Sequence, residues 1–242
     1  MLFDVLITAT KRPAILAKTL ESFKKNLFKD APVTVFLNVD PVGSTCDPRV
    51  LLEVVLDYFP NVVWRNPALP DFAKAFKWCW MQSSADWVFH LEDDWELVRP
   101  VDLGKLVATL EKNKDLALLR LPFFYSGEMA MKNWNKFFPW NGEFYECPKE
   151  MRQGVGFCGH PSLIKGEFVR SIAPHLSGES NPEKQFHHIN TKLINEVLKW
   201  RYGVYGVPIS PPFLKDLGRK WMVQNNLKKK GSKAFFTTWE EV

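Results

Sequence analysis

The sequence predicts an α/β protein whose first half forms a parallel sheet with helices on both faces. Two observations predict it. Up to residue 94, short apolar runs alternate with longer segments in which apolar residues recur at helical spacing. Hydrophobic residues make up 46% of the 242 positions, which is ordinary for a globular protein and enough for a sizeable core.

The strands of the first half are the runs rich in β-branched residues, beginning with FDVLITAT. They are predicted at 3–10, 33–40, 61–66 and 85–94. The helices between them are predicted at 12–28, 48–59 and 71–84. Pro13 fits the first turn of the first of these helices. Strands that alternate with helices in this way pair in parallel and place helices on both sheet faces.

The second half is less regular. Strands are predicted at 116–124 and 202–210, helices at 162–176 and 181–200, and an elaborate loop or hairpin at 125–148, and the Lys-rich residues from 211 onward predict a mobile, solvated tail. The sequence shows neither an internal repeat nor a clear linker. We therefore predict a single domain over residues 1–242.

The composition and the cysteine spacing argue against a membrane-spanning protein, a secreted protein and a disulfide-linked protein. The 32 basic and 27 acidic side chains give a net charge of +5, which is compatible with an anionic ligand but does not require one. No apolar run reaches the roughly 18 residues of a membrane span. Met1 leads straight into a strand, so we expect no signal peptide and a cytoplasmic protein, in the host cytoplasm if the source is a virus. The spacing of the cysteines favours reduced thiols over disulfides or zinc: Cys46, Cys79, Cys147 and Cys158.

Three carboxylates stand side by side in WVFHLEDDWEL, residues 87–97. Glu92, Asp93 and Asp94 follow the fourth predicted strand, and ligands of open α/β sheets bind outside the carboxyl ends of the strands. Adjacent like charges repel, so a positive partner is expected. Mg²⁺ or Mn²⁺ fits, because such an ion takes one or two carboxylates, several waters and substrate phosphates. The alternative is an acidic surface turn that caps a helix.

Three segments, in their order along the chain, resemble those of the GT-A class of nucleotide-sugar glycosyltransferases. Within that class the resemblance is to family 2-like enzymes. The segments are ITATKRPAILAKTLESF, the strand that ends in NVDP, and HLEDDW. In that class an acidic motif, written D-x-D and sometimes E-D-D, closes the nucleotide-binding half. The later FLKDLGRKW also resembles a C-terminal segment of some members. The resemblance implies a Rossmann-like central sheet flanked by helices, with a nucleotide-binding half at 1–100 and an acceptor-binding half at 101–242.

The resemblance also implies roles for individual residues. Asp40 would accept hydrogen bonds from the base or the ribose, and the first strand end would border the nucleoside and its phosphates. The nucleotide-binding set is Thr8, Thr10, Arg12, Asp40, Asp93, Arg219 and Lys220. Asp94 and Glu92 would hold Mn²⁺ or Mg²⁺. The alternatives are a capping role for Thr10, a surface position for Arg12 and a simple turn at Asp40.

The implied reaction moves a sugar from a nucleoside-diphosphate sugar, UDP-linked, to an acceptor hydroxyl. An inverting transferase needs a base for that hydroxyl, and Glu183, after Pro182 at a predicted helix start, is the candidate. Asp216 is a second catalytic candidate, as a further metal ligand. Arg219 and Lys220 would meet the leaving diphosphate. Glu183 alternatively only complements the helix dipole, and in a retaining enzyme it would lose this role.

The acceptor contacts are predicted at Trp134, Trp140 and His160, where a buried, satisfied histidine is the alternative for His160. Two acceptor classes stay open: a saccharide or glycoconjugate, and DNA with a hydroxymethylated pyrimidine, as in phage DNA glycosyltransferases. Aromatic and basic residues that could stack bases and meet phosphates support DNA: Lys132, Trp134, Lys136, Phe137, Phe138, Trp140, Lys228, Lys229, Lys230 and Lys233. A non-catalytic nucleotide- or carbohydrate-binding module is a further alternative, against which the intact acidic triplet argues.

Overall fold

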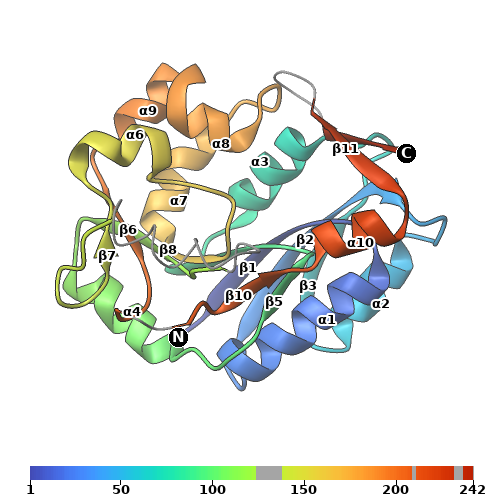
Figure 1. The fold of residues 1–242 in the computed structure, drawn as a ribbon, viewed down its shortest axis with the longest axis horizontal. Coiled ribbons are helices and arrows are strands. Elements are labelled where there is room, and N and C mark those ends of the chain that lie inside the picture. Colours follow the sequence, from blue (N-terminus) through green and yellow to red (C-terminus); the bar gives the residue numbers. More distant parts are fainter. Residues whose placement is uncertain (124–137, 209–210, 232–236, 242) are drawn as a thin grey trace.

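A mixed sheet of eight strands forms the centre of the computed structural model, which describes residues 1–123, 138–208, 211–231 and 237–241. The strand order is β3-β2-β1-β4-β8-β6-β9-β7. Helices pack on both of its faces (Figure 1). The α/β fold class predicted from the sequence is therefore confirmed. Within the described ranges, no helix has the length and apolarity that crossing a bilayer requires.

Four parallel strands make up the N-terminal side of the sheet. β1 (Phe3–Lys11) lies between β2 (Val33–Gly43) and β4 (Trp87–Glu92), and β3 (Asn61–Arg65) pairs with β2. Because all four run in one direction, their carboxyl ends meet along one edge. The register there places Thr10 beside Asp40 and Thr8 beside Glu92.

The helices divide between the two faces of this sheet. One core cluster joins the sheet to α1 (Pro13–Phe23), α2 (Arg49–Leu56) and α4 (Leu103–Lys112). The other joins it to α3 (Phe72–Gln82), α7 (Gly166–Ile172) and α9 (Thr191–Val197). The shorter helical pieces are α6 (Arg152–Val155), α8 (Pro182–Lys184), α10 (Gly218–Gln224), the 3-10 turns Lys149–Met151 and Ala173–His175, and the π-helical turns Lys24–Phe28 and Gln185–Ile189.

The sequence prediction of a helix over 162–176 is wrong for its first residues, which form β8 (Ser162–Lys165). This strand runs antiparallel to both β4 and β6 (Leu116–Arg120). All four of its residues are buried, but only Leu163 and Ile164 are apolar, so the run is too short for its period to distinguish a strand from a helix. β9 (Arg201–Val204) and β7 (Tyr145–Glu146) complete the sheet.

The prediction of a solvated tail from residue 211 onward is also wrong. β10 (Leu214–Asp216) pairs antiparallel with β5 (Trp95–Leu97), and Leu214 is fully buried. α10 follows, and β11 (Leu227–Gly231) pairs with β12 (Thr237–Glu241). Arg12, just before α1, lies 5.4 Å from the ring centroid of Trp221 on α10, so this C-terminal segment returns to the N-terminal half.

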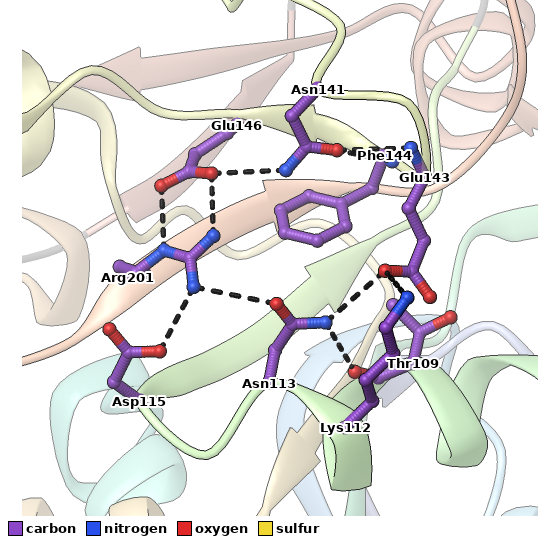
Figure 2. Close-up of polar contacts among 9 residues, drawn as sticks. All are labelled: Thr109, Lys112, Asn113, Asp115, Asn141, Glu143, Phe144, Glu146 and Arg201. Atoms are coloured by element: carbon purple, nitrogen blue, oxygen red, sulfur yellow. Dashed lines mark hydrogen bonds and ion pairs between the residues drawn. The ribbon is translucent and has the colours of Figure 1, made fainter.

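A polar network attaches the edge strand β7 to the rest of the sheet (Figure 2). Arg201 on β9 donates from Nε and Nη2 to the two carboxylate oxygens of Glu146, at 2.7 and 2.6 Å. Its third nitrogen, Nη1, donates to Asp115 Oδ1 at 3.0 Å and to Asn113 Oδ1 at 3.4 Å. The guanidinium therefore bridges β7 to the segment between α4 and β6. Two parallel bonds to one carboxylate are the strong form of this interaction.

Replacing Arg201 with Met removes all of these bonds. We expect a loss of about 1.5–3 kcal/mol in the free energy of unfolding, the range for hydrogen bonds to charged groups. Denaturant titration measures it. Arg201 lowers the pKa of Glu146, chiefly through their hydrogen bonds, so this stabilisation is present at neutral pH and is lost as pH falls through that lowered pKa.

Lys112 is the matched control, because its side chain is 71% exposed where it meets Glu143. Lys112→Met should change stability by less than about 0.5 kcal/mol. An Arg201→Met protein as stable as the wild type would mean that backbone pairing with β9 alone holds β7.

Candidate functional site

A cleft of about 420 Å³ opens at the edge where β1, β2 and β4 end. It gathers strand ends from the first half of the chain with loop residues from the second half. The residues that line it are Thr8, Ala9, Thr10, Arg12, Asp40, Val42, Pro70, Asp71, Phe72, Glu92, Asp93, Asp94, Trp95, Phe123, Gly159, His160, Asn181, Glu183, Asp216 and Arg219.

The floor of the cleft is a buried ion pair between Arg12 and Asp93. Arg12 donates from Nη2 to Asp93 Oδ1 at 2.5 Å and from Nε to Oδ2 at 3.2 Å. Thr10 adds its backbone N–H and its hydroxyl to Oδ2, at 3.0 and 3.2 Å. The side chains of Arg12 and Asp93 are only 3% and 4% exposed. The positive partner that the acidic triplet requires is thus supplied, for Asp93, by the chain itself.

The backbone of Asp93 is held as firmly as its side chain. Its carbonyl accepts a hydrogen bond from Thr19 on α1 at 2.8 Å, and its N–H donates to the Thr8 carbonyl at 3.3 Å. The guanidinium of Arg12 also lies 5.4 Å from the ring centroid of Trp221 on α10. The end of β4 is therefore joined to β1, to α1 and to the C-terminal helix.

Asp94 turns into the cleft beside Asp216. The pairing of β5 with β10 places Asp216 opposite Trp95, and Leu217 N–H donates to the Asp94 carbonyl at 2.8 Å. Glycine at position 218 leaves room for the Asp94 carboxylate, because a Cβ there would lie 2.1 Å from Asp94 Oδ2 and would force that side chain to move. Burial and then the charge of Asp93 raise the pKa of Asp94 to about 6, with Asp216 adding to this effect and Arg12 opposing it. Arg12 Nη2 also donates to Asp94 Oδ2 at 3.1 Å, and Asp216 pairs with Arg219. Asp93, Asp94 and Asp216 thus share two guanidinium groups and are one positive charge short.

That shortage fits a divalent cation. Among the described residues, no group of three or more His, Cys, Asp or Glu side chains could hold a metal by itself. Mg²⁺ and Mn²⁺ do not require one, since they bind one or two carboxylates and complete their shell with waters and phosphates. Asp94 and Asp216 would supply the protein ligands. Glu92 lines the same cleft nearer Gly159, where its Oε1 would be 3.2 Å from an added Cβ, and its role as a metal ligand stays a prediction.

Asp40 lies at the other end of the strand edge, where β2 ends. Asn38 Nδ2 donates to its Oδ1 at 2.8 Å, and the Asp71 N–H donates to its Oδ2 at 3.2 Å. Burial raises the pKa of Asp40. Within the described part of the chain, the buried Thr8 hydroxyl has no hydrogen-bond partner. Both groups therefore keep capacity for a bound polar molecule.

Glu183 reaches the cleft from the second half of the chain. Asn181 caps the short helix α8, which begins at Pro182. Glu183 Oε1 accepts the Gly159 N–H at 2.6 Å, so its carboxylate is bonded to a different loop and not to its own helix. His160 follows in that loop, with its ring 4.3 Å from that of Phe123.

The structure brings most of the predicted site residues into the one cleft, and their individual roles stay predictions. Arg219 reaches it while paired with Asp216, Nε to Oδ2 at 3.1 Å. Lys220 is exposed and Trp140 packs on Tyr145, and neither lines the cleft. Trp134 lies outside the described residues. Asp71, Trp95, Phe123 and Asn181 also line it and were not predicted, although Trp95 directly follows the acidic triplet.

Comparisons with known proteins identify the fold. No family model and no curated protein matches the sequence. S. aureus TarS matches with a TM-score of 0.61 at 11% identity, over 89% of this chain and 36% of TarS. TarS 1–349 in complex with UDP-GlcNAc matches with a TM-score of 0.61 at 14% identity, over 96% and 60% of the two chains. The complex of TarS 1–349 with UDP gives 0.60 at 14% identity, over 89% and 60%.

This chain thus spans between about a third and three fifths of the TarS chains that it matches. At such low identities the likeness shows the fold alone. The central sheet, its flanking helices and this likeness together show a GT-A-type fold, as the sequence resemblance implied.

The ion pair in the cleft floor predicts that replacing Asp93 and replacing Asp94 change the free energy of unfolding in different ways. Arg12→Met should lower the free energy of unfolding by about 3–5 kcal/mol, because it leaves Asp93 buried without a cation. Asp93→Leu should cost less, because Arg12 keeps its bond to Asp94 at 3.1 Å. The double variant should lose much less than the sum. Asp94→Asn should be neutral or stabilising, since the raised pKa of Asp94 means that its charge opposes folding at neutral pH.

Denaturant titration of these variants at pH 7 measures the differences. A strongly destabilised Asp94→Asn protein, or additive losses in the double variant, would contradict this account of the floor.

Proposed function

We propose that the protein is a metal-dependent glycosyltransferase. It moves a sugar from a nucleoside-diphosphate sugar, UDP-linked, to an acceptor hydroxyl with inversion. One observation carries the proposal: Asp94, whose pKa is raised, and Asp216 face a cleft that Glu183 enters from the other half of the chain, and with Asp93 they share only the two cations of Arg12 and Arg219. The GT-A-type fold supports it, and TarS 1–349 of that fold has been solved with UDP and with UDP-GlcNAc.

The donor occupies the strand edge in this proposal. The nucleoside lies by Asp40, which accepts hydrogen bonds from the base or the ribose, and Thr8 and Thr10 border the phosphates. Arg12 contributes through Asp93, because the short bonds between them direct its guanidinium into the floor. It therefore holds the site together and does not carry the diphosphate by itself.

The leaving diphosphate requires positive charge. Asp94 and Asp216 would hold Mn²⁺ or Mg²⁺, which supplies Lewis acidity at that group when bound. Arg219 lies beside Asp216 with an exposed side chain and adds a cation at the same end of the cleft. Lys220 is the next residue, and its exposed side chain reaches the diphosphate only if it turns toward the cleft.

Glu183 is the base in this proposal. Its Oε1 is held by the Gly159 N–H, which leaves the other carboxylate oxygen for the acceptor hydroxyl. A base opposite the leaving group suits a single displacement and hence inversion. His160 lies in the same loop and contacts the acceptor.

The acceptor in this proposal is a saccharide or a glycoconjugate. Most of the residues that favoured DNA lie outside the described part of the chain or have undescribed side chains. Phe138 is buried, with the Arg120 guanidinium 5.3 Å from its ring centroid, and Trp140 packs on Tyr145. Phe138 is therefore not available to stack on a base, and the partly buried Trp140 does not line the cleft. We further propose that residues 1–242 form one domain, since the central sheet joins both halves.

A panel of nucleoside-diphosphate sugars with Mn²⁺ tests the function, scored for binding, hydrolysis and transfer to saccharides. Hydroxymethylated and unmodified DNA at matched salt form a second set of acceptors. Binding of a UDP-sugar with transfer to a saccharide is the expected result. Transfer to modified DNA alone would replace the acceptor class, and binding without transfer or hydrolysis would favour a non-catalytic module.

Asp94→Asn should abolish Mn²⁺-dependent binding of the nucleotide and reduce transfer to background, because the amide loses the charge that holds the cation. Calorimetric titration of UDP with and without Mn²⁺ measures the binding. Glu96→Gln is the matched control: Glu96 follows two residues later, pairs with Lys18 and does not line the cleft. Wild-type turnover in Asp94→Asn would remove this residue from the metal site.

Glu183→Gln should lower kcat by roughly 10²-fold or more while nucleotide binding stays unchanged, because the amide keeps the bond to Gly159 but cannot accept a proton. Steady-state kinetics and UDP titration separate the two effects. Glu179→Gln is the control, an exposed carboxylate four residues earlier in the chain. Unchanged kcat in Glu183→Gln would move the base elsewhere.

A further inference from the structure

Cys158 directly precedes Gly159, which lines the cleft, and faces a fixed cation. Arg120 Nη1 donates to its Sγ at 2.8 Å. Arg120 is on β6 and is 3% exposed, and its Nη2 donates to the Val155 carbonyl at 3.0 Å. The guanidinium therefore cannot turn away from the sulfur without breaking a second bond in the same loop.

Two other groups that carry charge lie near Cys158, one in its own loop and one in α8. His160, in the same loop, also hydrogen-bonds to its sulfur, while Glu183 of α8 contributes an opposing negative charge. Burial by itself would raise the pKa of the thiol, but Arg120 and His160 outweigh burial and lower it to about 6. Cys158 nevertheless keeps part of its surface exposed. Reactive cysteines occupy such electropositive, partly exposed places.

The remaining cysteines have different surroundings. Cys79 is buried with its sulfur near the carbonyls of Ile7 and Phe36, and burial raises its pKa to about 12. Burial likewise raises the pKa of Cys147 to about 11. Cys46 is partly exposed and accepts a hydrogen bond from the Ser44 hydroxyl at 3.0 Å. Cys46 is therefore the internal control for access.

We propose that Cys158 is a reactive thiolate, and that it is a covalent modification site for soft carbon electrophiles next to the loop that lines the cleft. In the reaction with iodoacetamide, the sulfur electron pair forms a bond to the methylene carbon. The carbon–iodine bond breaks and iodide leaves with its pair. No base takes part, because Arg120 and His160 stabilise the sulfur in its deprotonated form.

The adduct would act on the candidate base through the loop. Gly159, next to Cys158, holds Glu183 by a 2.6 Å hydrogen bond, so a group added to Sγ displaces this contact or fills the acceptor space. This consequence rests on the proposed function. The reactivity of the thiolate does not rest on it.

The pH dependence of labelling gives a sharp expectation. At pH 6.5 a thiol of pKa about 6 is roughly three-quarters ionised, whereas an ordinary thiol of pKa about 8.5 is about 1% ionised. The lower basicity reduces the reactivity of the thiolate itself by roughly 10- to 20-fold. Cys158 should thus react several-fold faster than glutathione at pH 6.5 and more slowly than glutathione at pH 8.5.

The experiment labels the native protein with iodoacetamide between pH 5 and 9 and quantifies each cysteine peptide by mass spectrometry. The expected result is a Cys158 rate with a midpoint near pH 6 and preference for Cys158 over Cys46 at pH 6.5. A rate that still rises between pH 8 and 9, or Cys46 labelled as fast as Cys158 at pH 6.5, would overturn the proposal.

Two variants test the cause. Arg120→Gln should move the midpoint up by more than one pH unit, and Arg120→Lys should restore part of the shift. If Arg120→Gln does not fold, His160→Gln replaces it, with a smaller upward movement expected. An unchanged midpoint in a folded Arg120→Gln protein, or in His160→Gln where that replaces it, overturns the proposal.

The activity readout separates this proposal from the proposed function. Iodoacetamide at pH 6.5 should inactivate transfer in step with Cys158 labelling, and Cys158→Ser should resist inactivation. Selective labelling in a protein that transfers no sugar would leave the thiolate standing and remove the glycosyltransferase. Transfer that survives complete labelling of Cys158 would overturn the proposed effect of the adduct on Glu183 through Gly159.

Discussion

The cleft depends on the buried ion pair between Arg12 and Asp93. A carboxylate with so little exposure is tolerated only when charged and neutral donors satisfy its oxygens, and Arg12 and Thr10 do so. The same pair holds the end of β4 against β1 and the start of α1. Two adjacent aspartates can therefore differ in role. The carboxylate of Asp93 is bonded to Arg12 and Thr10 and stabilises the fold, whereas Asp94 faces the cleft.

Segments from the N-terminal and C-terminal parts of the sequence meet at this pair, where Arg12 lies 5.4 Å from the Trp221 ring centroid. β10 adds to β5, and Gly218 allows the backbone of α10 to approach Asp94, which places Asp216 and Arg219 at the same opening. Glu183 arrives from a third segment and is held by Gly159. The cleft is thus built from segments that are distant in sequence, and its alignment depends on backbone contacts as much as on side chains.

Charge is distributed unevenly along the cleft. At the strand edge, carboxylates outnumber nearby cations, which raises the pKa of Asp94 and favours a bound metal ion. At the loop side, Arg120 and His160 outweigh burial and lower the pKa of Cys158. In the proposed reaction, the metal-bound diphosphate of the donor would lie at the strand edge and the acceptor beside Glu183. The leaving diphosphate gains negative charge as it departs, and the metal at the strand edge would stabilise that charge.

The amino-acid pattern alone determined the first four strands, the helices between them and the position of the acidic triplet, because apolar periodicity and parallel pairing are readable locally. It could not show that 162–165 form a strand, since a short run buried on both faces looks the same in a helix. Nor could it distinguish Asp93 from Asp94, or show that residues 214–216 pair with 95–97. Only the tertiary structure decided these points, because each depends on a partner far away in the sequence whose approach no local pattern encodes.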